Sequence, residues 1–102
     1  MSVLSVDKNN FEMIKNSKGI VLLDFYADWC GPCRMVSPIV EEIARENPQF
    51  TIGKINVDNE PELAGAFSVT SIPTLVVIKD GVIINQSAGA RPKSQILAML
   101  EG

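Results

Sequence analysis

The sequence predicts an α/β fold for residues 1–102, taken as a single domain with a central mixed β-sheet and helices on both faces. The first observation is the hydrophobic periodicity, which changes repeatedly along the chain between a strand pattern and a helix pattern. The expected order is β-α-β-α-β-α-β-β-α. Its early alternation favours parallel strands, and a turn signal at Asp80-Gly81 adds an antiparallel hairpin at the edge of the sheet.

The first two strands are expected to enclose one short helix. Residues 3–6 indicate a brief strand, and Asp7 is expected to cap a helix that turns Phe11 and Ile14 toward the core. Residues 20–27 then form a nearly continuous apolar run that contains one acidic residue. Such a run is typical of a central strand that is covered on both faces.

A strong helical pattern follows Cys33. Apolar residues recur at helical spacing from Val36 onward, with charged residues between them. Pro38 lies inside this pattern, so we expect it to kink the helix rather than to begin it. Asn47-Pro48 ends the helix, and residues 50–57 alternate as the next strand.

The last third of the chain predicts one short helix, a hairpin and a final helix. Asn59-Glu60-Pro61 resembles a helix start, and the helix is expected to run to Phe67. Residues 74–78 and 82–85 are expected to pair as the two strands of the hairpin. Pro92 begins the last predicted helix.

Composition excludes several classes of function. Nine Lys and Arg against twelve Asp and Glu give a formal net charge of -3, which argues against nucleic acid and anionic membranes as partners. The chain has no histidine, so triads and metal sites that need imidazole are excluded. The N-terminal residues lack the basic and apolar regions of a secretory signal, and the apolar stretches are too short to cross a membrane. We therefore expect a cytoplasmic protein.

The two cysteines of the chain, Cys30 and Cys33, are the most informative feature. They stand in a C-x-x-C motif at the end of the predicted central strand and at the start of a helix. A helix N-terminus favours a thiolate over a thiol, so we expect the outer Cys30 to be the nucleophile and Cys33 the resolving thiol. A purely structural disulfide, half of a zinc site shared by two chains, and two unrelated buried thiols are the alternatives. We expect no metal.

The segment around the cysteines resembles the active site of the thioredoxin family. Asp24 to Met35 reads Asp-Phe-Tyr-Ala-Asp-Trp-Cys-Gly-Pro-Cys-Arg-Met, and the likeness continues over essentially the whole chain. It includes Pro38 and the segments 54–58, 71–75, 79–81 and 89–90. The resemblance implies the thioredoxin fold and a protein that reduces disulfide bonds in other proteins.

Two charged residues are expected to support the chemistry. Asp24 lies inside the apolar strand, where burial would raise its pKa and suit it to accept the Cys33 proton; the alternative is an acid in water on an edge strand. The family resemblance implies the same role. Lys54 resembles the family lysine and is the expected charge partner of Asp24, with an ordinary surface lysine as the alternative.

A docking surface for substrates is expected around Cys30. The resemblance implies a cis bond before Pro73 that faces the cysteines, and the backbone of Ile72 would then be free to pair with an extended substrate segment. The expected apolar collar consists of Trp29, Gly31, Pro32, Ile72, Pro73, Gly89 and Ala90.

These expectations together describe a protein-disulfide reductase that serves electron transport and cell redox homeostasis. The resemblance implies that a separate thioredoxin reductase, usually an NADPH-dependent flavoprotein, restores the dithiol, and that this chain binds no cofactor. Its partners would be disulfide-containing client proteins and the reductase, and the chain is expected to be a monomer. A disulfide oxidase or isomerase, or a non-enzymatic binding module that uses the collar, are the alternative functions.

Overall fold

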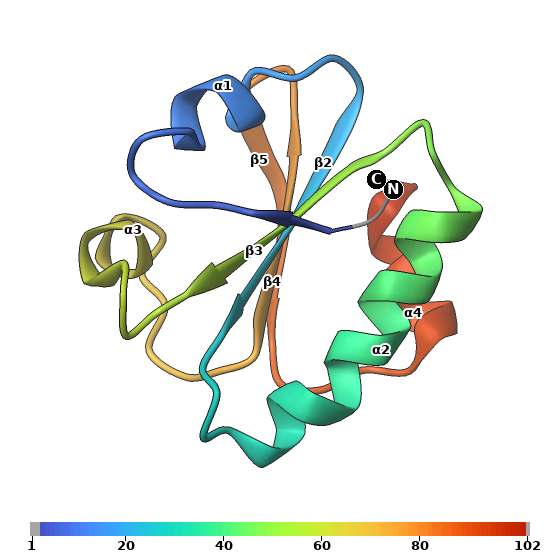
Figure 1. The fold of residues 1–102 in the computed structure, drawn as a ribbon. Coiled ribbons are helices and arrows are strands. Elements are labelled where there is room, and N and C mark those ends of the chain that lie inside the picture. The colour runs from blue at the N-terminus through green and yellow to red at the C-terminus, as the bar shows by residue number, and fades with distance from the viewer. Residues whose placement is uncertain (1–2, 102) are drawn as a thin grey trace.

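The computed structural model describes residues 3–101, which form a five-stranded sheet and four helices (Figure 1). The strands lie side by side in the order β1-β3-β2-β4-β5, and the element order along the chain is the predicted one. The strands are β1 (Leu4–Ser5), β2 (Ile20–Tyr26), β3 (Thr51–Asn56), β4 (Thr74–Lys79) and β5 (Val82–Ala88). The helices are α1 (Phe11–Lys15), α2 (Gly31–Glu46), α3 (Pro61–Ala66) and α4 (Lys93–Leu100).

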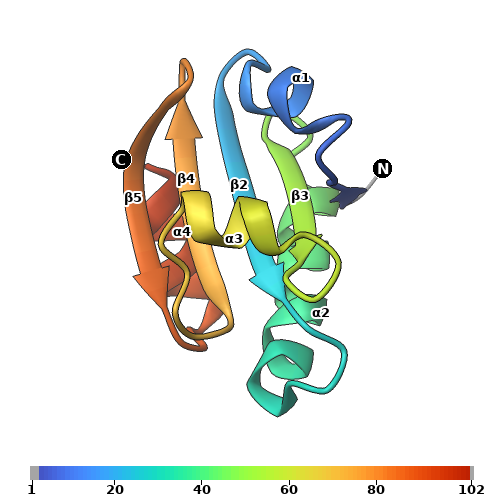
Figure 2. The same cartoon turned by 90° about the vertical axis from the view of Figure 1, so that its left-hand side faces the viewer.

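The helices cover both faces of the sheet, as predicted. Figures 1 and 2 show α2 and α4 together on one face and α1 and α3 on the other. Each face has its own apolar core: one joins the sheet to α2 and α4 through residues such as Val40 and Ile96, and the other reaches α1 and α3 through Ile14 and Ala64. The sheet is therefore the middle layer of three.

Strand β2 lies at the centre of the sheet. It pairs in parallel with β3 and antiparallel with β4, so that Asp24 stands opposite both Lys54 and Leu75. The prediction placed the antiparallel part only in the closing hairpin. In the structure β4 already runs opposite to β2, because α3 returns the chain to the sheet without making a parallel crossover.

Three predicted details differ at the ends of elements. Asp7 caps the turn before α1 rather than the helix itself: its carboxylate accepts the N–H groups of Asn9 and Asn10 at 2.8 and 3.0 Å. Asn10 then occupies the N-cap of α1. Strand β1 covers only Leu4–Ser5, and β5 continues past the predicted residue 85.

Helix α2 connects the sheet to the cysteine pair. Cys30 is its N-cap residue, Pro32 lies in its first turn, and the helix continues across Pro38 to Glu46. The position of Pro38 inside the helix is thus confirmed, while the kink stays a prediction. The side chains of Val36, Val40 and other α2 residues are buried against the sheet, which fixes the helix start relative to β2.

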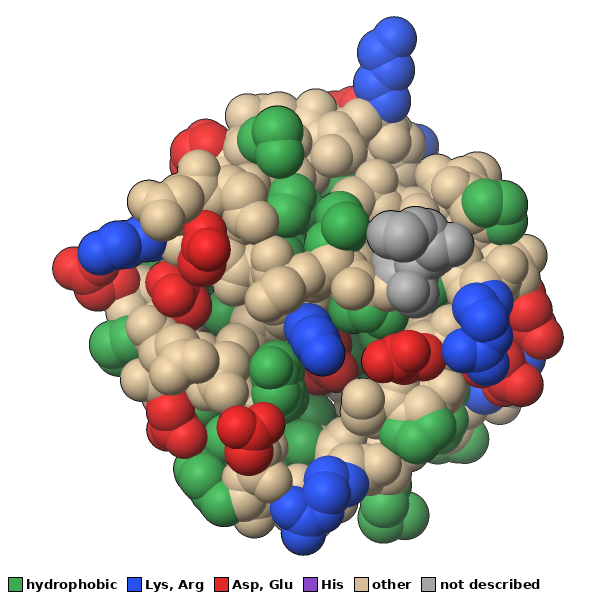
Figure 3. Space-filling model, viewed as in Figure 1, with side chains coloured by type: hydrophobic (Ala, Val, Ile, Leu, Met, Phe, Trp, Pro, Cys, Tyr) green, Lys and Arg blue, Asp and Glu red, His purple; other side chains and the backbone are tan. Residues whose placement is uncertain are grey.

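The visible surface carries charges of both signs. Figure 3 shows acidic and basic side chains interspersed with apolar ones over the face that Figure 1 presents. Among residues 3–101, none of the helices is long and apolar enough to cross a lipid bilayer.

Candidate active site

The cysteine pair lies just beyond the carboxyl end of β2, at the N-terminus of α2. Cys30 and Cys33 form a disulfide, with their Cα atoms 5.3 Å apart, and both residues are buried. The backbone N–H of Cys33 donates to Sγ of Cys30 at 3.2 Å. A helix N-terminus that directs an N–H at a sulfur also stabilises negative charge on that sulfur once the disulfide is reduced.

The loop before β4 borders the disulfide. The carbonyl oxygen of Ile72 lies 3.8 Å from Sγ of Cys30, and the Ile72-Pro73 peptide bond is cis, as the resemblance implied. The carbonyl of Pro73 accepts the N–H of Gly89 at 2.7 Å, which joins this loop to the segment after β5. Residues far apart in the sequence are therefore held around one sulfur.

Trp29 projects from the molecule next to Cys30. Its side chain is 68% exposed, although its indole N–H donates to Oδ2 of Asp58 at 2.8 Å. An exposed aromatic ring held by a hydrogen bond is suited to contact another protein. Asp58 is not among the site residues predicted from the sequence. Its only signal there was its place in the segment 54–58, which resembles the family.

Two apolar pockets are lined by members of the expected collar. One of about 390 Å³ lies between Trp29 and Ile72, and one of about 300 Å³ lies between α2 and the segment around Ala90. Gly31 and Pro32 are exposed at the start of α2, whereas Pro73 is buried. The expected collar is thus brought together by the fold. Pro73 differs from Gly31 and Pro32 because it is buried, and the docking role of the collar stays a prediction.

Asp24 is a buried carboxylate in the central strand. It is 4% exposed, and its Oδ1 has no hydrogen-bond partner among the described residues. Burial raises the pKa of Asp24 to about 7, and the nearby charge of Lys54 opposes part of this rise. The alternative of a solvated acid on an edge strand is therefore wrong.

Lys54 lies opposite Asp24 on β3 and is half-buried. Its Nζ lies 5.8 Å from the centre of the Tyr26 ring, within the range of a cation–π contact. Together with Cys33 and Tyr26 it lines a pocket of about 230 Å³. Lys54 is therefore not a fully exposed surface lysine, since it pairs in register with Asp24 and lines the same pocket as Cys33. Its influence on the reaction stays a prediction.

The described residues hold no group of three or more His, Cys, Asp or Glu that is arranged for a metal ion. The cysteine pair is instead a disulfide beside apolar pockets and a buried acid whose pKa is close to neutral. This combination of groups is suited to thiol–disulfide exchange, because it offers a stabilised sulfur, a place for another protein and a proton acceptor.

Comparison with known proteins gives the same chemistry. The family described as Thioredoxin matches residues 2–102. The chain is 42% identical to thioredoxin of Bacillus subtilis over 97 residues, or 94% of this chain and 92% of the relative. It is 49% identical to thioredoxin of Listeria monocytogenes over 83 residues, or 80% of this chain and 81% of the relative.

A solved structure agrees with these relatives. A mutant thioredoxin from Halobacterium salinarum NRC-1 superposes with a TM-score of 0.92 at 35% identity, over 98% of this chain and 88% of the other. The Cys30–Cys33 disulfide and these matches establish a protein-disulfide reductase that works by dithiol–disulfide exchange. The chain belongs to the thioredoxin family.

Proposed function

We propose that Cys30 is the nucleophile and Cys33 the resolving cysteine of this reductase. The Cys30 thiolate attacks one sulfur of a client disulfide, which forms a mixed disulfide and releases the other client sulfur as a thiolate. The observation that carries this assignment is the hydrogen bond from the Cys33 N–H to Sγ of Cys30. Only Cys30 receives such a donor at the helix N-terminus, so its thiolate is the better stabilised of the two.

We propose that Asp24 accepts the proton of Cys33 in the second step. The Cys33 thiolate then attacks Sγ of Cys30, forms the Cys30–Cys33 disulfide and expels the client as a dithiol, so that two electrons pass to the client. A carboxyl with a pKa of about 7 can take this proton and return it at neutral pH. Lys54 limits how far burial raises that pKa and thus keeps the acid in a useful range.

We propose that the client lies across the surface around Cys30. Trp29 and Ile72 border one apolar pocket and Ala90 borders the other, so a segment over Cys30 would contact both. Gly31 and Pro32 are exposed beside the sulfur, and a side chain added at Gly31 would meet no other atom within 4 Å. Gly89 supports the surface through its bond to Pro73. The backbone of Ile72 is the group that would pair with the extended client.

We propose that residues 1–102 act as one domain and as a cytoplasmic monomer, in electron transport to protein disulfides. A separate thioredoxin reductase would return the dithiol, with NADPH and a flavin on that partner as the source of electrons. Family membership supports this partner, since a reductase that gives up two electrons in each cycle must recover them. The alternative functions, a disulfide oxidase or isomerase, are disfavoured because the chain resembles the reducing members of the family.

The two cysteine roles are tested by trapping. Cys33→Ser is expected to attack a disulfide-containing protein and to accumulate as a covalent mixed disulfide, because no thiol remains to resolve it. Cys30→Ser is the matched control, with the same atom exchanged three residues away, and it is expected to form no adduct and to reduce nothing. Non-reducing electrophoresis and mass spectrometry measure the adduct.

Adducts that accumulate with Cys30→Ser but not with Cys33→Ser would reverse the assignment. Turnover that survives in both variants would contradict dithiol exchange altogether. A redox titration of the wild-type pair separates reductase from oxidase, since a reductase requires a low reduction potential.

A further inference from the structure

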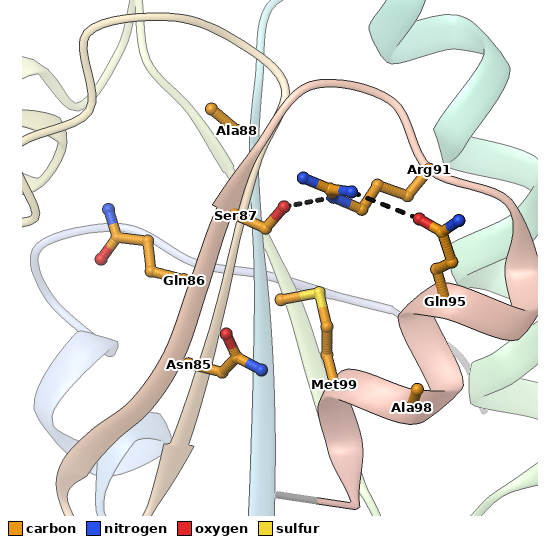
Figure 4. Close-up of a pocket in the computed structure, with 8 residues that line it drawn as sticks. All are labelled: Asn85, Gln86, Ser87, Ala88, Arg91, Gln95, Ala98 and Met99. Atoms are coloured by element: carbon orange, nitrogen blue, oxygen red, sulfur yellow. Dashed lines mark hydrogen bonds between the residues drawn. The ribbon is translucent and has the colours of Figure 1, made fainter.

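A groove away from the cysteines has no place in the disulfide chemistry. It encloses about 580 Å³ between β5 and α4, on the face of the sheet that α2 and α4 cover (Figure 4). It is lined by Asn85, Gln86, Ser87, Ala88, Arg91, Gln95, Ala98 and Met99. The cysteines line none of it, so its chemistry has to be considered separately.

The groove runs along the free edge of the sheet. Strand β5 is the last strand in the sheet order and pairs only with β4. Because neighbouring side chains of a strand point to opposite faces, a groove lined by four successive residues, 85–88, also reaches the backbone at the strand edge. The strand contains neither a charged residue nor proline, the two kinds of residue that usually protect an edge from pairing. Its backbone can therefore receive an additional strand.

Arg91 is the only charged side chain that lines the groove. Figure 4 shows its guanidinium turned back toward β5, where it donates to the hydroxyl of Ser87 and, at 3.2 Å, to Oε1 of Gln95. Both partners are neutral, and within residues 3–101 no carboxylate oxygen lies within 4.0 Å of this arginine. The groove thus offers a positive charge without an acidic partner, above an apolar floor that includes Met99.

The groove is also continuous with the surface around the cysteines. Arg91 lines both this groove and the pocket between α2 and Ala90. Gly89, two residues earlier, is tied to Pro73, and Ile72 lies beside Sγ of Cys30. A bound protein that reaches past Ala90 therefore meets the charge of Arg91 next.

We propose that this groove binds an extended segment of a partner protein that carries an acidic side chain. The segment would add to the edge of β5 through its backbone, and its carboxylate would pair with the Arg91 guanidinium. The uncharged strand gives the backbone contact, and the unpaired arginine selects the acid. This binding needs no thiol, so it goes beyond the exchange reaction and stands or fails independently of it.

The test uses the oxidised protein and a defined probe. The probe is a blocked peptide of six residues with alternating valine and threonine and one glutamate, compared with the same peptide carrying glutamine instead. Amide chemical shifts are expected to move at residues 85–88, Arg91 and Gln95. The glutamine peptide is expected to bind about tenfold more weakly, the effect of about 1.4 kcal/mol for one charge-assisted hydrogen bond. Rising salt is expected to reduce this difference.

Variants and a modified probe identify the contacts. Arg91→Gln is expected to bind both peptides equally, while Arg45→Gln, an exposed arginine on α2, is expected to keep the preference for glutamate. A glutamate peptide that is N-methylated at alternate residues is expected to lose binding, because it cannot pair with a strand edge. Arg91→Gln spectra also verify that the variant is folded.

Equal affinity of the two peptides for the wild-type protein would overturn the proposal, and this comparison needs no variant. Shifts confined to Trp29 and Ile72 would also overturn it, because the peptide would then occupy only the client surface. A dimer in sedimentation, together with amide shifts at residues 85–88 that grow with protein concentration, would assign the edge to self-association instead.

Discussion

Strands β2 and β5 belong to one sheet and each has seven residues, but they differ in how far they are buried. Strand β2 is central, and five of its seven residues are buried. In β5 five residues are exposed, and its first residue, Val82, is 62% exposed. The redox pair follows the buried strand, whereas the groove with Arg91 lies along the exposed one.

The difference has a physical reason. A central strand is held by hydrogen bonds on both sides and by apolar layers on both faces, so the residues at its end stay in fixed positions. An edge strand keeps unpaired backbone groups that another chain can use. In this fold the chemistry therefore lies at the end of the most constrained strand, and the exposed edges and loops stay free to contact other proteins.

The largest expected effect concerns the one polar exception in β2. Asp24→Asn is expected to stabilise the protein at pH 8 and to slow the step in which Cys33 resolves the mixed disulfide. With a pKa near 3.8 unfolded and about 7 folded, the stability cost of the carboxyl is absent below pH 3.8 and complete above pH 7. That cost is on the order of 4 kcal/mol, and asparagine should recover part of it.

Urea denaturation at pH 4 and pH 8 measures the two free energies of unfolding. The advantage of Asp24→Asn should be small at pH 4 and large at pH 8. Lys54→Met is the control, since it removes a charge that lowers the Asp24 pKa. With Asp24 still present, this variant should lose more stability than the wild-type protein as the pH rises. An advantage that is the same at both pH values would show that burial does not penalise this carboxylate.

A matched pair of valines tests the contrast between the two strands directly. Val21→Ala in β2 removes two fully buried methyl groups and is expected to cost about 2 kcal/mol of stability. Val82→Ala in β5 makes the same change where the side chain is exposed, and it should alter stability by less than about 0.5 kcal/mol. Equal losses in urea denaturation would mean that β5 is as constrained as β2.

Much of this arrangement could be predicted from local pattern. The apolar run that becomes β2 contains one acid, and this alone indicated both a central strand and a buried Asp24. The C-x-x-C motif predicted the redox pair, because the end of the strand and the start of the helix are adjacent in the sequence. The element order followed from periodicity, since each element carries its own pattern.

The remainder depends on contacts between distant segments. The reversed direction of β4 could not be read from periodicity, because parallel and antiparallel strands have the same repeat. Asp58 and Trp29 are 29 residues apart, and the Ile72 carbonyl that borders Cys30 is 42 residues away from it in the sequence. Such features have no local signal, since they arise only when the chain is folded.

A smaller effect than those of Asp24→Asn and Val21→Ala is expected for recognition around Trp29. Trp29→Phe keeps an exposed ring but loses the indole donor to Asp58, and Asp58→Ala removes the acceptor of the same bond. Each change is expected to lower kcat/KM for a disulfide-containing protein by about threefold to tenfold, the range of one net hydrogen bond of roughly 0.5–1.5 kcal/mol. The double variant should be no worse than either single one, because both remove one interaction. Additive losses would mean that the two residues contact the client separately. A loss of stability beyond about 0.5 kcal/mol would mean that Trp29 supports the fold, as the buried residues of β2 do, rather than the binding of clients around Cys30.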